Sequence, residues 1–142
     1  MSVVSHLING ELVESQRTLD VTNPSTGKVV RQVADASAAD VERAIAAAQA
    51  AFPAWRDTPP AKRAQVMYRF KQLLEEHAER LVQLVSEEHG KTVEDAMGEL
   101  KRGIENVEYA CGVPELLKGE YSHNVGPGID AWSNFQPLGV VA

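Results

Sequence analysis

Thr92-Val-Glu-Asp-Ala-Met-Gly98-Glu-Leu-Lys-Arg102-Gly-Ile-Glu-Asn106-Val-Glu-Tyr-Ala-Cys111 has the pattern of one amphipathic helix. Its apolar residues recur at helical spacing and form a single stripe: Val93, Leu100, Ile104, Val107 and Cys111. Thr92 is a preferred N-terminal cap, and Asp95 predicts a capping box with it. Pro114 lacks a backbone donor and clashes with the preceding turn, so the helix is expected to kink or stop there.

Two further helices are predicted upstream. The first begins at Ser37, which is expected to form a capping box with Asp40, and it is expected to end at Pro53. The second begins with the start signal at Thr58 and keeps helical apolar spacing down to Gly90. At about 1.5 Å per residue it would span roughly 45 Å, which is long for a compact domain of this size. We therefore expect it to lie against additional polypeptide.

Two β-hairpins are predicted near the N-terminus. Asn9-Gly10 lies between short apolar segments and suits the positive φ angles of a tight two-residue turn. Two later segments, residues 19–22 and 29–33, flank a turn in which Pro24 presets one angle and Gly27 can adopt the left-handed conformation. The pair formed by Gly27 and Lys28 does not predict a phosphate loop, because the upstream glycine of that motif is absent and no helix follows directly.

The C-terminal part predicts strands without partners. A polar loop at Tyr121–Asn124 is expected to lead through a glycine-proline turn into a partly alternating strand at Ile129–Phe135. The letters of residues 126–131 match a dinucleotide fingerprint, but the flanking pattern favours a turn. Gln136–Ala142 predicts a buried strand, which needs neighbouring strands and a covering layer. For this reason we expect the chain to be a fragment of a longer protein.

The composition argues against several classes of protein. There are 14 basic and 20 acidic residues with a net charge of −6, and the basic residues of the second predicted helix lie among glutamates, so no nucleic-acid surface is predicted. No apolar run approaches the roughly 20 residues of a membrane span. The N-terminal residues lack the features of a targeting leader, and we expect a cytoplasmic protein.

No catalytic constellation is predicted within these 142 residues. Cys111 is the single cysteine, has no metal-ligand spacing to any histidine, and lies on the apolar stripe of its helix, which favours a packing role. His89, next to the helix-closing Gly90, is interpreted as a favourable cation near a helix C-terminus.

Arg102 is the candidate binding residue. It lies off the apolar stripe, where Glu99 and Glu105 are at helical spacing from it, and a surface salt bridge is one interpretation. Gly98 and Gly103 are poor helix residues, and a close approach by another backbone or a ligand would explain them. The alternative is that Arg102 grips a carboxylate with both guanidinium nitrogens.

Several separated motifs resemble the N-terminal part of the aldehyde dehydrogenase superfamily. They cover essentially the whole chain and are Ile8-Asn9-Gly10, Asn23-Pro24-Ser25-Thr26-Gly27, Glu88-His-Gly-Lys91-Thr92, Gly98 to Pro114, and Pro137-Leu-Gly-Val-Val141. The run Arg102-Gly-Ile-Glu-Asn106 is most similar to the CoA-acylating methylmalonate-semialdehyde dehydrogenases.

This resemblance implies an NAD-dependent reaction in which a cysteine thiolate attacks an aldehyde, hydride passes to NAD and a thioester remains. In this branch the acyl group loses carbon dioxide and is transferred to CoA, which gives propionyl-CoA. The family's oxyanion asparagine, cysteine, glutamate and NAD contacts are expected beyond Ala142, so the chain alone is expected to be inactive. Arg102 is the one residue assigned by the resemblance, because its family counterpart binds the substrate carboxylate.

The resemblance also implies an α/β fold with two β-hairpins, three helices that pack on the NAD-binding domain, and the start of an oligomerisation hairpin. Residues 1–120 are assigned to the NAD-binding domain, 121–136 to the oligomerisation hairpin and 137–142 to the first strand of the remainder. The expected partners are a small carboxylated aldehyde and further copies of the enzyme in a dimer or tetramer. No metal, nucleic acid or membrane partner is expected.

Two other functions are compatible with the sequence. One is a non-acylating aldehyde dehydrogenase that acts on a different aldehyde, such as succinate semialdehyde. The other is a short, non-catalytic helical module that binds or regulates a full-length relative. It would fold as a compact monomer with a cooperative melt, whereas a fragment would expose apolar surface.

Overall fold

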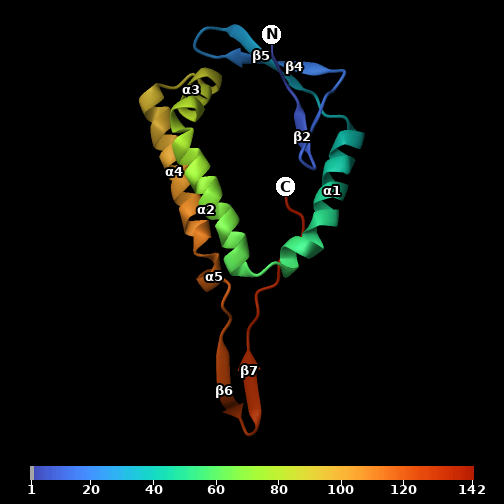
Figure 1. The fold of residues 1–142 in the computed structure, drawn as a ribbon, viewed down its shortest axis with the longest axis vertical. Helices are drawn as coiled ribbons and strands as arrows, with labels where there is room; N and C mark the ends of the chain where they lie inside the picture. The colour runs from blue at the N-terminus through green and yellow to red at the C-terminus, as the bar shows by residue number, and fades with distance from the viewer. Residues whose placement is uncertain (1) are drawn as a thin grey trace.

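The computed structural model describes residues 2–142 and has an open α/β architecture (Figure 1). A small sheet at one end connects two helical arms, and a β-hairpin projects from the other end. The arms consist of α1 (Ala38–Asp57) on one side and of α2 (Pro60–Glu76), α3 (Ala78–His89) and α4 (Val93–Cys111) on the other. The C-terminus lies between the arms (Figure 1).

The first predicted hairpin is confirmed. Strands β2 (His6–Ile8) and β3 (Glu11–Val13) pair antiparallel, with Ile8 opposite Glu11. Asn9 and Gly10 connect them with φ angles of 53° and 80°, as a tight two-residue turn requires.

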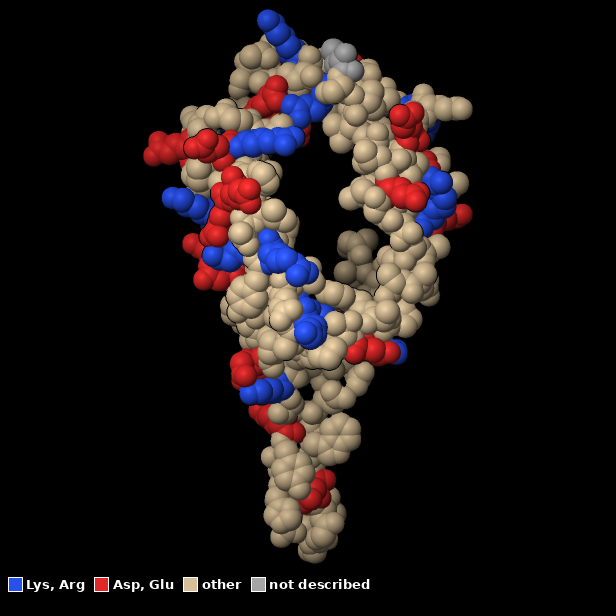
Figure 2. All heavy atoms as spheres, in the orientation of Figure 1, with Lys and Arg blue, Asp and Glu red and all other residues tan. Residues whose placement is uncertain are grey.

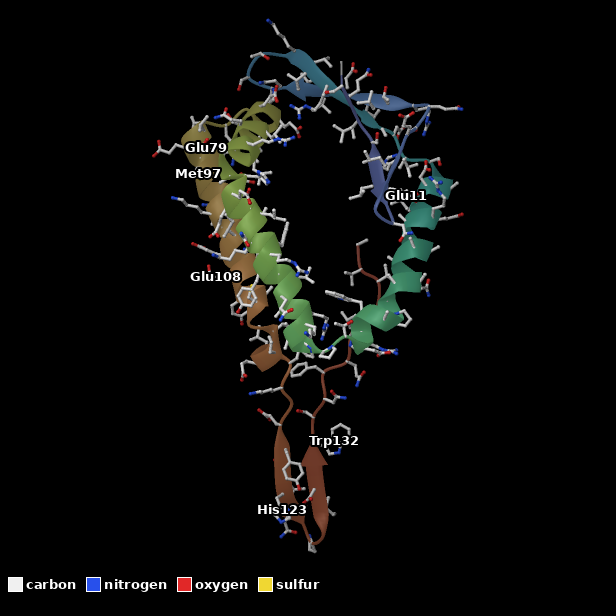
Figure 3. The ribbon with its side chains drawn as sticks, in the orientation of Figure 1. Glu11, Glu79, Met97, Glu108, His123 and Trp132 are labelled. Carbon is white, nitrogen blue, oxygen red and sulfur yellow. The ribbon has the colours of Figure 1, made fainter. Side chains whose placement is uncertain are left out.

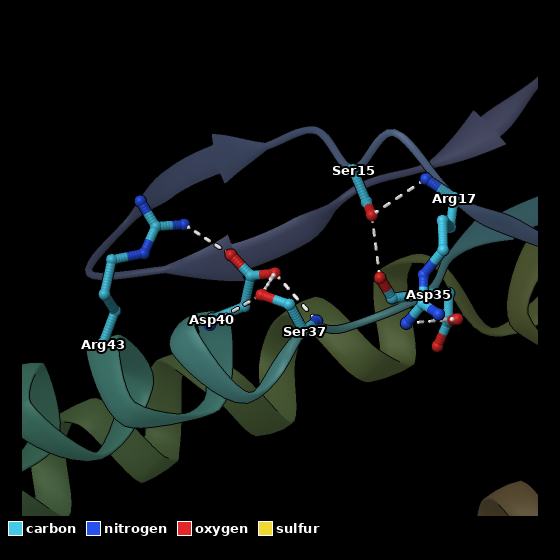
Figure 4. Close-up of polar contacts among 6 residues, drawn as sticks. All are labelled: Ser15, Arg17, Asp35, Ser37, Asp40 and Arg43. Atoms are coloured by element: carbon cyan, nitrogen blue, oxygen red, sulfur yellow. Dashed lines mark hydrogen bonds and ion pairs between the residues drawn. The ribbon is translucent and has the colours of Figure 1, made fainter.

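The second predicted hairpin is also confirmed. Strands β4 (Thr18–Asn23) and β5 (Lys28–Ala34) pair antiparallel, and Gly27 adopts a φ of 67° in the turn between them. The short strand β1 (Val3–Val4) adds to β5 in parallel, which gives the sheet the order β1-β5-β4. Ser15 and Arg17 tie the approach to β4 to the end of β5, because the Ser15 hydroxyl donates to the Asp35 carbonyl at 2.8 Å and Arg17 pairs with the Asp35 carboxylate at 3.0 Å (Figure 4).

The start of α1 is as predicted, but its end is not. Ser37 and Asp40 form a full capping box, with the Ser37 N–H donating to Asp40 at 2.9 Å (Figure 4). Pro53 was expected to end this helix, whereas α1 continues to Asp57. Thr58 supports the extended end: its backbone N–H donates to the Trp55 carbonyl at 3.2 Å and its hydroxyl to the Ala54 carbonyl at 2.8 Å. Pro53 lacks one backbone N–H donor, but the helix continues because the other backbone hydrogen bonds around it still form.

The single long helix expected from Thr58 to Gly90 is wrong in two respects. His77, with φ −102° and ψ 14°, breaks it into α2 and α3. Thr58 completes α1, and the N-terminal cap of α2 is Pro59. Apolar spacing continues through the break because both helices contact α4 with one face, so periodicity alone could not reveal it. The length argument from a single 45 Å helix therefore fails.

Helix α4 matches its prediction closely. The Thr92 hydroxyl accepts a hydrogen bond from the Asp95 N–H at 3.2 Å, although the return bond that would complete a capping box is not formed among the described residues. The helix stops at Cys111, and Pro114 lies in the first turn of the short α5 (Val113–Leu116), where the missing donor costs little.

The C-terminal segment departs from the prediction made from the residue pattern, although a hairpin does form within residues 121–136, where the resemblance implied one. Tyr121–Asn124, predicted as a polar loop, belongs to strand β6 (Tyr121–Gly126), which pairs antiparallel with β7 (Ile129–Trp132). Both faces of this hairpin are exposed, so β6 carries no apolar alternation that would mark it as a strand. The strand expected at Ile129–Phe135 ends at Trp132, and residues 137–142 form no strand, because no described segment pairs with them.

Very little of residues 2–142 is buried. The buried apolar residues are Ala34, Ala64, Val82, Ala96 and Cys111, and Val82 is the largest fully buried side chain. The accessible surface is 10799 Å², whereas a compact protein of this mass exposes roughly 7,200 Å². Large apolar side chains of α1, such as Val41 and Ile45, remain half exposed. The arms therefore present apolar surface that residues 2–142 do not cover.

Candidate functional site

Arg102 lies on the exposed side of α4, as the sequence predicted. Helix α4 packs on α2 and α3 through the opposite face, where Ala96 and Cys111 are buried. Because Ala96 lies near the start of α4 and Cys111 at its end, this packing holds the helix along most of its length. Arg102 is consequently presented on a rigid element rather than on a loop.

The guanidinium of Arg102 lies back over Gly98, one helical turn earlier. A side-chain carbon at Gly98 would be 3.7 Å from Nη1 of Arg102, which is ordinary van der Waals contact, and no other group of residues 2–142 outside the local helix backbone lies within 4 Å of that carbon. At Gly103 a side chain would meet nothing within 4 Å. No other described backbone approaches these glycines, so the close approach expected from the sequence is not formed within residues 2–142.

The surface-salt-bridge interpretation of Arg102 is not confirmed. Within residues 2–142 its guanidinium makes no ion pair, although Glu99 and Glu105 are each three residues away. The backbone carbonyl of Arg102 is engaged, because Asn106 Nδ2 donates to it at 2.8 Å. The charged group of Arg102 is thus free to meet an anion.

Glu99 is occupied by another partner. Nζ of Lys91 donates to Oε2 of Glu99. The hydrogen bond and charge of Lys91 hold the pKa of Glu99 below its usual value, with smaller contributions from the charges of His89 and Arg102. Lys91 and Glu99 were not predicted as a pair, because Lys91 precedes the helix cap and shares no helical spacing with Glu99.

The segment that carries Lys91 is docked against the sheet. Gly90 adopts a left-handed φ of 81°, and its carbonyl accepts a hydrogen bond from the Ser25 hydroxyl at 3.0 Å. The Ser86 hydroxyl donates to the Lys91 carbonyl at 2.7 Å. Arg31 of β5 pairs with Glu87 and, at 3.2 Å, with Glu88 at the end of α3. Sheet and helices therefore form one connected unit around Lys91.

The other candidate groups do not form a reactive site. Cys111 is buried, and its thiol donates to the Val107 carbonyl at 3.4 Å, in agreement with a packing role. Gly128 lies in the turn between β6 and β7, where no helix begins, so the fingerprint letters do not form a nucleotide site. No cluster of metal-ligating side chains is found among residues 2–142.

Two hollows lie away from Arg102. One, of about 380 Å³, lies where the arms meet and is lined by Arg56, Asp57, Arg63, Leu117, Phe135, Gln136 and Pro137. The other, of about 410 Å³, lies between the β4–β5 turn and the end of α3, and includes Ser25 and Lys91. Neither is lined by Arg102, so the candidate carboxylate contact is an exposed surface and not a closed pocket.

The charged surface is mixed, as predicted. Lys71 pairs with Glu75 at 2.7 Å and with Glu108 of α4 at 3.7 Å. Figure 2 shows acidic and basic side chains interspersed along the helical arms, with few charges on the projecting hairpin. No helix in the described part of the chain combines the length and apolarity that a membrane crossing requires.

The β6–β7 hairpin is a second candidate surface. Large apolar side chains on it are exposed, among them Val125, Ile129 and Trp132, and the hairpin stands clear of the helical arms (Figure 3). A two-stranded hairpin has two free edges and is marginal in water unless something packs on it. The surface is therefore suited to a protein partner.

Asp130 organises this hairpin from within. Its carboxylate accepts hydrogen bonds from the Tyr121 hydroxyl at 2.5 Å and from the Asn124 N–H at 2.8 Å, and it lies 3.0 Å from His123 Nδ1. The bond from Tyr121, followed by those from Asn124 and His123, lowers the pKa of Asp130, while Asp130 raises the pKa of Tyr121. The sequence did not indicate this cluster, because Tyr121–Asn124 was predicted as a loop and the register of β6 against β7 shifts between Ser122 and Gly126.

Comparison with known proteins gives one consistent match. Residues 12–142 match the model described as the aldehyde dehydrogenase family. The chain is 67% identical to malonate-semialdehyde dehydrogenase of Pseudomonas aeruginosa, over 100% of this chain and 29% of that protein. It is 43% identical to the acylating, mitochondrial methylmalonate-semialdehyde dehydrogenase of Arabidopsis thaliana, over 98% of this chain and 23% of that protein.

Solved structures agree with this match. The methylmalonate-semialdehyde dehydrogenase of Oceanimonas doudoroffii superposes with a TM-score of 0.92 and 63% identity, over 97% of this chain and 28% of that one. The corresponding protein of Sinorhizobium meliloti 1021, solved in complex with NAD, gives 0.91 and 42% identity, over 98% of this chain and 29% of that one. The chain therefore spans less than a third of the length of these relatives and corresponds to their N-terminal portion.

Proposed function

The chain belongs to the aldehyde dehydrogenase family, and from this membership we propose that it forms the N-terminal part of an NAD-dependent, CoA-acylating dehydrogenase. The proposed substrate is malonate semialdehyde or methylmalonate semialdehyde. The identities of 67% and 43% to relatives of those names support the substrate class. For methylmalonate semialdehyde the balanced reaction converts substrate, CoA and NAD to propionyl-CoA, carbon dioxide and NADH.

NAD and CoA are assigned to regions other than this chain. NAD accepts the hydride in the proposed reaction, and the NAD complex of the Sinorhizobium relative supports its use. The described residues offer no dinucleotide cradle, because the glycines at 126 and 128 close a hairpin turn instead of opening a helix. We likewise place the nucleophilic cysteine and its glutamate outside residues 1–142, since Cys111 is buried in helix packing.

The contribution of this chain is recognition of the substrate carboxylate by Arg102. The observation that carries this role is that Arg102 is exposed and makes no ion pair within residues 2–142, on a packed helix where Glu99, one turn earlier, is already paired with Lys91. A guanidinium can bind a carboxylate through two parallel hydrogen bonds. Both proposed substrates carry a carboxylate beside the reacting aldehyde, so one such contact orients the aldehyde.

The test is replacement of Arg102 in the complete dehydrogenase. Arg102→Leu should raise the KM for the carboxylated semialdehyde by about tenfold or more, as expected for a lost charge-assisted pair. The Arg102→Leu variant should oxidise propanal, which has no carboxylate, as before. Arg102→Lys should lose part of the affinity for the carboxylated substrate, because lysine retains the charge but cannot form the two parallel hydrogen bonds of a guanidinium. An unchanged KM for the carboxylated substrate in Arg102→Leu would show that Arg102 is not the clamp.

The acylating character needs its own measurement. The complete enzyme should form acyl-CoA thioester in step with NADH, and NADH formation should depend on CoA when the thioester is hydrolysed slowly. If NADH appears with free acid as the sole carbon product in the presence of CoA, the enzyme is of the non-acylating type. That result would leave the Arg102 contact intact as a separate question.

Domain assignment follows from the same proposal. We assign residues 1–120 to the NAD-binding domain, with the open apolar faces of the arms packed on the rest of that domain. Residues 121–136 form a hairpin for subunit association in a dimer or tetramer, supported by its exposed apolar side chains and free edges. Residues 137–142 lead into the remainder of the fold, where a strand can find partners.

A further inference from the structure

The arrangement of Glu99 and Arg102 poses a problem for a carboxylate clamp. Glu99 precedes Arg102 by one helical turn, and an acidic residue N-terminal to a basic one is the favoured order for an ion pair on a helix. Such a pair would place a carboxylate on the guanidinium that is meant to receive the substrate. Glu105 stands in the less favoured order and is not paired with Arg102 within residues 2–142.

Lys91 resolves this conflict. Its Nζ holds the Glu99 carboxylate, and the side chain of Lys91 is only 20% exposed, whereas that of Glu99 is 49% exposed. The backbone of Lys91 is set independently of Glu99, by the 2.7 Å bond from Ser86 and by the neighbouring left-handed Gly90. A largely buried stem and a fixed backbone make Lys91 a stable competitor for Glu99.

We propose that Lys91 is a positioning residue that sequesters the Glu99 carboxylate and thereby keeps the Arg102 guanidinium available for the substrate. The inference rests on the proposed role of Arg102. Lys91 itself touches neither the substrate nor the reacting atoms. When Lys91 is absent, Glu99 turns to Arg102 and competes with the substrate as an internal carboxylate.

The predicted effect lies in substrate affinity and is specific for charge. In the complete dehydrogenase, Lys91→Met should raise the KM for the carboxylated semialdehyde by about two- to fivefold, the range of a competing exposed ion pair, with kcat little changed. The double variant Lys91→Met/Glu99→Gln should restore the KM, because no carboxylate is left to occupy Arg102. Propanal should be used equally by all of these variants.

A matched control separates sequestration from loss of positive charge. Lys101 is adjacent to Arg102 in the sequence, is exposed and makes no ion pair within residues 2–142. Lys101→Met removes the same charge without releasing a glutamate, so it should leave the KM unchanged. Equal losses in Lys101→Met and Lys91→Met would overturn the inference in favour of a general charge effect.

Two further results would contradict the proposed role of Lys91. An unchanged KM in Lys91→Met, or a raised KM that Glu99→Gln does not restore, overturns the sequestration role. The unfolding midpoint of each variant shows whether a raised KM comes from loss of stability. If Lys91 had only a structural role, the midpoint would fall in the double variant as well as in Lys91→Met. Arg102→Leu tests the clamp separately: if it weakens the carboxylated substrate while Lys91→Met does not, the clamp stands and the role of Lys91 fails.

Discussion

Two parts of the protein are stabilised by different kinds of contact. One is the docked unit, in which the sheet packs against α3 and α3 packs against α4, and the other is the projecting hairpin β6–β7. In the docked unit, contacts join residues far apart in the chain, such as Ser25 with Gly90 and Arg31 with Glu87. In the hairpin, the contacts of Asp130 all reach residues on the facing strand. In the docked unit, contacts between distant residues hold the helix that carries Arg102 in place. In the hairpin, contacts between the two strands maintain its local structure, while its apolar surface remains exposed to a partner.

The largest effect on stability is expected at Gly90, whose left-handed conformation places it against the β4–β5 turn. In Gly90→Ala a side-chain carbon would lie 2.7 Å from Pro24 Cγ and 2.9 Å from Ser25 Oγ, at a φ of 81°. We expect a loss of about 3 kcal/mol in stability, from backbone strain together with displacement of the β4–β5 turn.

Gly10→Ala is the matched control, because Gly10 has a φ of 80° and a side-chain carbon there would meet no group of residues 2–142 within 4 Å. It carries strain without a clash and should cost only about 1 kcal/mol. Urea unfolding of the complete protein measures both variants. If they lose equal stability, the docking of the turn on Gly90 does not contribute.

A smaller change is expected at Gly103, on the open face of α4. No group in the described part of the chain lies within 4 Å of a side-chain carbon placed there, so Gly103→Ala should stabilise the helix by up to about 1 kcal/mol. The unfolding midpoint of the complete protein checks this sign. A loss of stability would mean that another part of the assembled enzyme approaches Gly103, which was the interpretation first suggested by the sequence.

The smallest global effect is expected in the hairpin. Asp130→Asn should accelerate amide exchange at Asn124, whose N–H donates to Asp130 at 2.8 Å, without shifting the global unfolding midpoint. Asp57→Asn, at an exposed aspartate that pairs with Arg56 on α1, is the control and should leave the Asn124 amide unaffected. Unchanged exchange at Asn124 in the first variant would contradict the organising role of Asp130.

The pH dependence of the same amide follows from the pKa shifts. Because the pKa of Asp130 is lowered in the folded hairpin, its contribution is present above the usual carboxyl range and is lost as pH falls through the lowered value. Because the pKa of Tyr121 is raised, its contribution is present below the usual tyrosine range and is lost as pH rises through the raised value. Protection of Asn124 should therefore be greatest between these limits.

Local signals predicted the elements whose stabilising contacts are close in sequence. Asn9-Gly10 specified its turn through two positive φ angles, and Ser37 with Asp40 specified the start of α1. The stripe of α4 correctly assigned Cys111 to the packed face and Arg102 to the exposed one. These predictions succeed because a cap, a tight turn or a helical face involves only residues within one turn of each other.

The tertiary structure alone decided the features that depend on distant partners. The break at His77, the continuation of α1 past Pro53 and the absence of a strand at residues 137–142 all depend on what each segment packs or pairs with. The contact of Lys91 with Glu99 is of the same kind, because it exists only after Gly90 has turned the chain between two helices. Sequence spacing therefore placed Arg102 on the exposed side of α4, and only the folded chain showed that Glu99 is paired with Lys91.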